Sequence, residues 1–149
     1  HGIGELRLLI PAINRLDRWV MLVSPPYIPY APALERYGLD LSRLLVVRAA
    51  AKIDTLWSME QALRSGACSA VIAWAENAEE RALRRLQLAA ETGTSWAVLF
   101  RPSLRIDRRS PAPLRIGLHA HEPGGGLELR IVKQRSGLPA TVWVNASDA

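Results

Sequence analysis

The chain has 149 residues, enough for one domain with a single sizeable core. Hydrophobic residues make up 49% and charged residues 22%, a balance that excludes an intrinsically disordered chain. The net charge of +5 comes almost wholly from arginine and permits an acidic partner, either a protein or a nucleic acid. No apolar run approaches the roughly 18 to 20 residues of a membrane-spanning helix, so we expect no membrane partner.

The compartment is indicated by the cysteine count and by the start of the chain. The single cysteine, Cys68, cannot form an internal disulfide, which is typical of a reducing cytoplasm. No basic segment followed by an apolar core opens the chain, so we expect no signal peptide. These features predict a cytoplasmic protein in which Cys68 is a small buried hydrophobe. Because the first residue is His1 and not Met, we also expect that an N-terminal segment is missing.

Up to Arg101, short apolar runs alternate with helical patterns. Residues 6–16 carry apolar side chains at spacings of three and four, which predicts an amphipathic helix with a kink at Pro11. Strands are expected at residues 19–23, 44–47, 70–74 and 96–100, and further helices at 32–37, from Asp54 to Gly66 and from Asn77 to Gly93. Strands separated by helices predict a parallel sheet covered on both faces.

After Pro102 the pattern changes to alternation with period two. Residues 103–113 form a polar loop rich in arginine. Strands are expected at 114–121, 127–132 and 141–144, with the glycines at 124–126 as a hairpin tip. We therefore expect a single domain, 1–149, with an α/β part at 1–101 and a β-hairpin extension at 113–149, an antiparallel hairpin or meander appended to the parallel sheet.

Several phrases of the sequence resemble the core of the RecA family. They are residues 37–47 (YGLDLSRLLVV), 60–66 (EQALRSG) and the tail from Glu128 to Arg135 (ELRIVKQR). The resemblance implies an α/β fold of the RecA-like, P-loop NTPase-like kind, with a parallel sheet between helices and a C-terminal antiparallel β extension.

The same resemblance implies a degenerate nucleotide site. A P-loop requires Gly-Lys-Ser/Thr, so that Lys neutralises the phosphates and the hydroxyl binds magnesium. The resemblance places Gly4, Glu5 and Leu6 at that turn, Trp74 where the Walker B Asp belongs, and Pro26 near the position of the catalytic Glu. It therefore implies a pseudo-ATPase that binds no cofactor and is not an enzyme.

Two bacterial SOS-response families built on this core, ImuA and SulA, are more similar still. Residues 2–12, 25–34, 60–67 and 83–90 resemble ImuA. The SulA family shares Arg18-Trp19, Ser24-Pro25, Gly38-Leu39 and Ala62-Leu63-Arg64. Because SulA chains end soon after the fourth strand, the hairpin from Pro113 onward favours ImuA.

The leading interpretation is therefore a non-enzymatic, ImuA-like accessory protein of the SOS response to DNA damage. The resemblance implies that it supports mutagenic translesion synthesis by contacting RecA, an ImuB-like polymerase homologue and an error-prone DNA polymerase. The alternative is a SulA-like cell-division inhibitor that binds FtsZ and blocks septum formation. SulA-like chains carry a basic pair at Arg18 and Arg43 with a Trp between them, and this chain has Ala33 at the Trp position. Formation of a homo-oligomer stays open.

Aromatic and arginine residues dominate protein-binding hot spots, and this chain offers both types. Tyr27 and Tyr30 lie in a proline-rich loop that loses little entropy on binding, and Trp57 lies off the apolar stripe of its helix. The complete set of interface candidates is Arg18, Tyr27, Tyr30, Arg43, Trp57, Arg81, Arg84 and Arg85. The alternative for the last three is a solvated helix face on which Glu80 pairs with Arg84.

Two further groups of residues concern nucleic-acid binding and metal binding. Arg105, Arg108 and Arg109 replace the longer DNA-binding loop of the RecA family, and we expect at most weak or indirect phosphate contact from them. His119 and His121 share a strand face next to Glu122, but no third ligand cluster accompanies them. We therefore expect no metal site.

Overall fold

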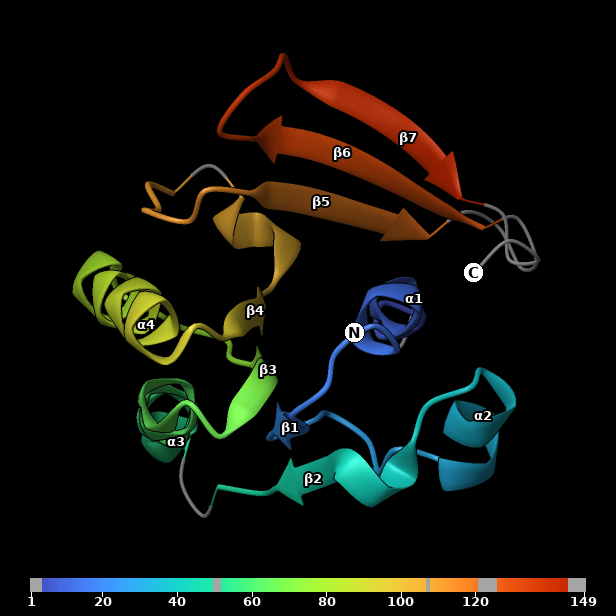
Figure 1. Ribbon diagram of the computed structural model, residues 1–149. Helices are drawn as coiled ribbons and strands as arrows, with labels where there is room; N and C mark the ends of the chain where they lie inside the picture. Colours follow the sequence, from blue (N-terminus) through green and yellow to red (C-terminus); the bar gives the residue numbers. More distant parts are fainter. Residues whose placement is uncertain (1–3, 50–51, 107, 121–125, 145–149) are drawn as a thin grey trace.

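The computed structural model describes residues 4–49, 52–106, 108–120 and 126–144, and it contains two separate sheets (Figure 1). The first is parallel, with the strand order β2-β1-β3-β4. Its elements are β1 (Trp19–Val23), β2 (Leu44–Val47), β3 (Cys68–Trp74), β4 (Trp96–Phe100), α1 (Ile10–Ile13), α2 (Ala31–Arg36), α3 (Lys52–Ser65) and α4 (Glu80–Gly93), with short 3₁₀ helices η1 (Arg7–Leu9), η2 (Leu41–Arg43) and η3 (Ser103–Arg105). The second sheet is antiparallel, with β6 (Leu127–Lys133) between β5 (Arg115–Ala120) and β7 (Ala140–Val144).

The core lies on both faces of the parallel sheet. On one face α1 and α2 pack Ile10, Ile13 and Leu34 against the strands, and on the other face α3 and α4 contribute Met59, Leu63 and Leu86. Successive strand residues point to opposite faces, so Ile72 joins the first cluster and its neighbours Val71 and Ala73 join the second. β3 has a strand on each side and helices on both faces, and all its residues are buried.

The helix boundaries differ most from the sequence-based expectation at two places, while α2 and α3 are shifted by one or two residues. The expected kinked helix over residues 6–16 is a short 3₁₀ turn followed by the four-residue α1, in which Pro11 occupies the first turn, where its missing N–H costs nothing. The helix expected from Asn77 begins at Glu80, with Glu79 as its N-cap residue. Arg101 Nη2 donates to the carbonyl of Ala78, 3.2 Å away, and so joins the loop before α4 to the end of β4.

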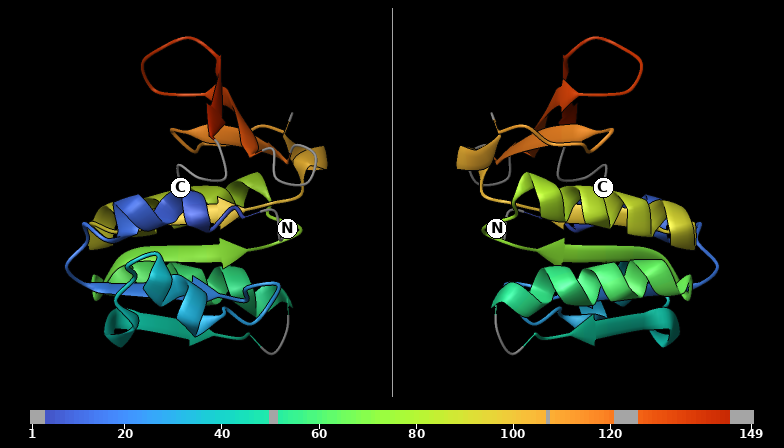
Figure 2. Two further views of the ribbon diagram at one scale, coloured as in Figure 1. Left: turned by 90° about the vertical axis from the view of Figure 1, so that its right-hand side faces the viewer. Right: turned by 90° about the vertical axis from the view of Figure 1, so that its left-hand side faces the viewer.

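The last three strands form an antiparallel meander, but it is not an extension of the parallel sheet, so the expectation that it is appended to that sheet is wrong. β4 pairs only with β3, and the antiparallel strands lie beyond the β4 edge as a sheet of their own (Figures 1 and 2). Between the two sheets the chain carries Pro102, Pro111 and Pro113, which cannot donate a backbone hydrogen bond to a strand ladder. Of the residues described in β5, β6 and β7, Gly117 alone is buried.

Helices α3 and α4 meet at the carboxyl end of α4, and the contact requires glycine. A Cβ added to Gly93 would lie 1.8 Å from the carbonyl oxygen of Leu63 in α3. That atom belongs to the backbone, so the contact cannot be relieved by a side-chain rotation.

We expect Gly93→Ala to lower the free energy of unfolding by about 1–3 kcal/mol, because the methyl group forces α3 and α4 apart. Helix propensity alone predicts the opposite sign, since alanine is favoured over glycine by up to about 1 kcal/mol inside a helix. Urea unfolding measures the difference, with Leu88→Ala at an exposed position of the same helix as the control. A Gly93→Ala protein as stable as the parent would contradict the close approach.

Candidate functional site

Arg18 holds the ends of two helices together. It lies just before β1, and its Nη1 donates to the carbonyls of Gly66 and Gly93, while Nη2 donates to the carbonyl of Thr94 at 2.5 Å. Gly66 follows α3, and Gly93 and Thr94 end α4. Helix carboxyl ends carry unpaired carbonyls and partial negative charge, so a guanidinium is well matched to both. Arg18 is therefore a structural clamp between α3 and α4.

Arg43 makes a separate set of contacts on the other side of β1. Its Nε donates to Asp40 Oδ2 at 2.9 Å and its Nη1 to the carbonyl of Leu16 at 2.9 Å. Asp40 also accepts hydrogen bonds from the backbone N–H and the hydroxyl of Ser42. The hydrogen bonds from Ser42, followed by that from Arg43, hold the pKa of the Asp40 carboxyl below its usual value.

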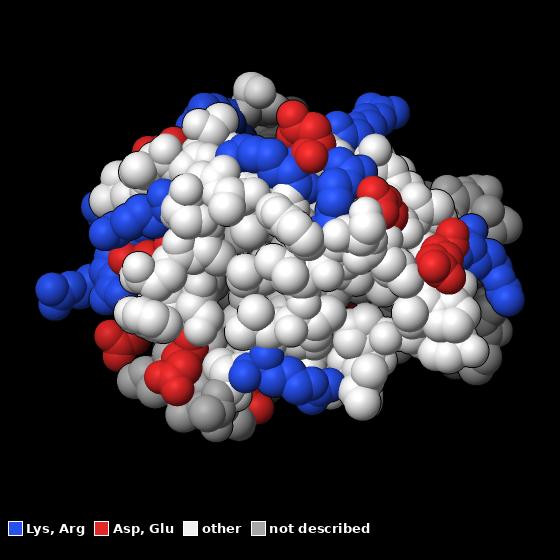
Figure 3. Space-filling model, turned by 60° about the horizontal axis from the view of Figure 1, so that its bottom comes forward, with Lys and Arg blue, Asp and Glu red and all other residues white. Residues whose placement is uncertain are grey.

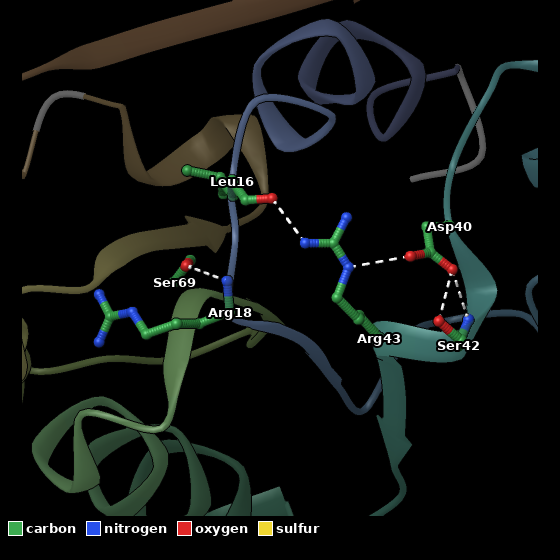
Figure 4. Close-up of polar contacts among 6 residues, drawn as sticks. All are labelled: Leu16, Arg18, Asp40, Ser42, Arg43 and Ser69. Atoms are coloured by element: carbon green, nitrogen blue, oxygen red, sulfur yellow. Dashed lines mark hydrogen bonds and ion pairs between the residues drawn. The ribbon is translucent and has the colours of Figure 1, made fainter.

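The two arginines that the sequence grouped as a basic pair therefore bind different groups of the protein. Figure 4 shows their guanidinium groups pointing apart, Arg18 toward the helix ends and Arg43 toward Asp40. Both line a cavity of about 50 Å³ near the amino end of β1. This volume suits one or two water molecules and excludes a substrate-sized ligand.

The arginines of α4 are all exposed, but they have different partners. Arg85 pairs with Glu60 of α3, a buried carboxylate that also accepts a hydrogen bond from Arg64 at 3.2 Å. The hydrogen bond from Arg85 to Glu60 raises the pKa of the Arg85 guanidinium above its usual value. Arg84 makes an exposed pair with Glu80 at 3.5 Å, and Arg81 is exposed. Arg85 thus joins α3 to α4, and its side chain is exposed like those of Arg81 and Arg84.

The aromatic candidates are exposed, and so are apolar side chains of the same loop and of β2. We define the β2-edge surface as Tyr27, Ile28, Tyr30, Leu45, Val46 and Trp57, all of them exposed. Figure 3 shows the side of the molecule on which β2 lies, with a broad uncharged area and charged groups mainly around its rim. Next to Trp57, an open depression of about 540 Å³ is lined by Val47, Arg48, Ala49, Asp54 and Ser58.

Ile28, Leu45 and Val46 were missed by the sequence reasoning. In the sequence, 44–47 is a short apolar run, which is typical of a buried strand. The tertiary structure places this strand at the outer edge of the sheet, where β2 pairs with β1 only. An edge strand leaves backbone groups and side chains open to a partner. The pattern of a single strand contains no signal for its position in the sheet.

The five residues assigned to a degenerate nucleotide site lie in different environments. Glu5 is buried and its Oε1 accepts a hydrogen bond from Trp74 Nε1 at 3.3 Å, so these two side chains join the start of the chain to the end of β3. Leu6 packs against the cluster beneath α1, Gly4 has a positive φ of 89°, and Pro26 is exposed after β1. Their observed role is to anchor the N-terminal segment and to shape a loop.

The remaining candidates are described only in part. Arg108 and Arg109 are exposed in the loop before β5, while the side chain of Arg105 and residue His121 lie outside the described structure. His119 is exposed on β5, and no group of three potential metal ligands occurs among the described residues. Cys68 is buried, and this burial raises the pKa of its thiol. In the described part of the chain, no helix has the length and apolarity to cross a membrane.

These features define an α/β protein whose candidate site is a set of exposed apolar side chains around the β2 edge. The family model for the cell division inhibitor SulA matches residues 4–97, and the chain belongs to the SulA family. It is 29% identical over 115 residues to SulA of Yersinia enterocolitica, covering 74% of this chain and 68% of that protein. It is 27% identical over 110 residues to SulA of Serratia proteamaculans, covering 72% and 66%. The chain thus spans about two thirds of the length of these relatives.

A solved structure gives the same result. The crystal structure of SulA from Pseudomonas aeruginosa superposes with a TM-score of 0.58 at 29% identity, covering 68% of this chain and 90% of that one. The assignment to ImuA is therefore wrong, and so is the assignment to a RecA-like, P-loop NTPase-like fold. The hairpin that favoured ImuA lies after residue 97, outside the matched family region. The interpretation of Gly4, Glu5, Leu6, Pro26 and Trp74 as lost Walker residues loses its basis with that fold.

We expect Arg18→Ala to lower the free energy of unfolding by about 2 kcal/mol, because it removes the donor from three carbonyls at two helix ends. Arg43→Ala is the matched control. Its ion pair with Asp40 is partly exposed, so we expect a loss below about 1 kcal/mol. Urea unfolding of both variants at neutral pH measures the difference. Equal losses would contradict the clamp.

The pKa of Asp40 should lie below its ordinary value of 3.8, as followed by NMR titration of the side-chain carboxyl. A carboxyl with a lowered folded-state pKa stabilises the fold above its unfolded-state pKa. That contribution is lost as the pH falls through the folded-state pKa, here below about pH 4. Ser42→Ala should raise the Asp40 pKa, since Ser42 provides the largest lowering contribution. An unchanged midpoint in Ser42→Ala would refute this cause.

Proposed function

We propose that this protein inhibits bacterial cell division during the SOS response by binding FtsZ and blocking its assembly, with the β2-edge surface as the contact. The observation that carries the proposal is the SulA family match over residues 4–97, which includes every residue of that surface. FtsZ therefore takes the place of RecA and an ImuB-like polymerase homologue as the proposed partner. The action is stoichiometric binding and involves no catalysis.

The chemistry of the surface supports a protein partner. Tyrosine and tryptophan give large contact areas at a low entropic cost and are enriched among binding hot spots. Tyr27 and Tyr30 lie in the loop between β1 and α2, which carries three prolines, so little chain entropy is lost when this loop binds a partner. Leu45 and Val46 add one exposed apolar side chain on each face of β2, whose four residues span about 13 Å.

The family's basic pair contributes in two different ways in this proposal. Arg43 precedes β2 directly, so its partly exposed guanidinium lies at one end of the β2-edge surface, where it suits an acidic group of the partner. Arg18 acts through the fold, because its guanidinium is used on the carbonyls of the helix ends. Ala33 replaces the aromatic residue of SulA-like chains. Tyr30, one helical turn earlier and exposed, supplies an aromatic side chain near that position.

We expect the protein to suppress the light scattering of FtsZ polymers at about one chain per FtsZ, and Trp57→Ala to weaken this effect about thirtyfold. Trp143→Ala is a matched control, because Trp143 is 58% exposed and Trp57 is 59% exposed, yet Trp143 lies on the second sheet. It should inhibit like the parent. Urea unfolding of both variants checks that the fold is intact.

Two outcomes would contradict the proposal. If the parent protein leaves FtsZ scattering unchanged, FtsZ is not the partner. If Trp143→Ala and Trp57→Ala lose inhibition equally, or neither loses it, the β2-edge surface is not the contact.

A further inference from the structure

Cations and exposed leucines gather at one end of the second sheet, where β5 begins and β6 ends (Figure 1). We define this basic-leucine end by Arg108, Arg109, Arg115, Lys133, Arg135, Leu104, Leu114 and Leu138. All of these residues follow position 97, so they lie outside the region matched by the SulA family model. The function proposed above makes no use of them.

Hydrogen bonds and strand register bring these residues together from three segments. Arg115 is the register partner of Lys133, and its Nη2 donates to the carbonyl of Ile106, two residues after Leu104. Lys133 Nζ donates to the carbonyl of Ser110 at 3.0 Å, which holds the segment containing Arg108 and Arg109 beside the sheet. In the turn after β6, Gln134 Nε2 donates to the carbonyl of Leu138 at 2.8 Å. The basic-leucine end is thus one surface built from three loops.

The charge of this surface is mainly positive, and Asp107 is the one acidic residue between Leu104 and the start of β5 in the sequence. Residues 108–120 and 129–144 contain no Asp or Glu, while they carry Arg108, Arg109, Arg115, Arg130, Lys133 and Arg135. The acidic residue of β6, Glu128, lies near the opposite end of the strand, in register with His119 and Trp143. An excess of cations attracts an anionic surface within a distance of about 10 Å at moderate salt.

The leucines identify the kind of anionic partner. Leu104 is 92% exposed and Leu138 is 83% exposed, both within loops next to the cations. Single-stranded nucleic acid is bound by cations together with aromatic stacking platforms, and the described part of this end has no aromatic side chain. An anionic bilayer fits both features, because its headgroups attract arginine and lysine while aliphatic side chains enter the acyl boundary.

We propose that the basic-leucine end docks peripherally on an anionic lipid bilayer. Arg108, Arg109 and Arg135 contact the headgroups, and Leu104 and Leu138 insert into the interface. The expectation of no membrane partner came from the absence of a spanning segment, and a peripheral contact needs none. The antiparallel sheet, which has little buried surface of its own, is then a docking module attached to the inhibitory α/β part.

Flotation with lipid vesicles tests the proposal on the full chain. Vesicles of phosphatidylglycerol and phosphatidylcholine in equal parts should bind the protein at low salt, and binding should fall at high salt and be absent with phosphatidylcholine alone. Two variants should each bind the anionic vesicles at least about tenfold more weakly than the parent. They are the triple variant Arg108→Gln, Arg109→Gln, Arg135→Gln and the double variant Leu104→Ser, Leu138→Ser.

Matched control variants change the same residue types on the α/β part. The charge control is Arg15→Gln, Arg36→Gln, Arg81→Gln, three exposed arginines, and the apolar control is Ile28→Ser, Leu88→Ser, also exposed. Both controls should bind the anionic vesicles like the parent. All the changed positions are exposed, so urea midpoints should stay close to that of the parent.

Several outcomes would overturn the proposal. They are no binding of the parent to anionic vesicles, equal binding to phosphatidylcholine alone, and equal weakening by the test and control variants. Loss of binding in the arginine variant but not in the leucine variant would mean that no side chain inserts. A duplex oligonucleotide that binds the parent more tightly than the vesicles do, and less tightly after the arginine changes, would assign the surface to nucleic acid.

Discussion

The contact between α3 and α4 is the constraint on which the rest of the structure depends. Three features converge on it: Gly93 against the backbone of Leu63, the Arg18 guanidinium on the carbonyls after both helices, and the buried Glu60 paired with Arg85. A buried carboxylate is tolerated because two guanidiniums, those of Arg64 and Arg85, satisfy it. With both helices fixed on one face and α1 and α2 on the other, the β3 strand is buried on both sides.

This arrangement leaves the β2 edge of the parallel sheet free, with exposed apolar residues along it. Natural proteins protect edge strands by keeping them short or charged. β2 is short but its outer residues, Leu45 and Val46, are apolar, which is costly in a monomer and useful at an interface. An inhibitor that acts by occupying a partner's assembly surface needs such a face and needs no catalytic group. The proposed contact, the β2-edge surface, and the Arg18 clamp are therefore separate features of the fold, although the sequence grouped Arg18 with Arg43.

The sequence predicted local structure well where the hydrophobic pattern was strong. The strands at 19–23, 44–47 and 96–100 have the expected bounds, and Trp57 is exposed because it lies off the apolar stripe of α3. The errors arose where sequence phrases were assigned to a family. SulA and ImuA were separated by a hairpin that lies beyond residue 97, in a region that the family comparison does not cover. The basic stripe of Arg81, Arg84 and Arg85 stays a prediction, and the pairing of Arg85 with a buried carboxylate on another helix could not be read from the sequence.

The sequence by itself determined the order of strands and helices, the exposure of the proline-rich aromatic loop and the burial of Cys68, since each depends on local pattern and composition. Only the tertiary structure decided which strand lies at the sheet edge, which arginines are held by carbonyls or carboxylates, and that the last three strands form a sheet of their own. The reason is that register, edge position and ion pairing join residues far apart in the chain. Arg18 and Thr94 are separated by 76 positions yet share a hydrogen bond, and no periodicity within a single element encodes that contact.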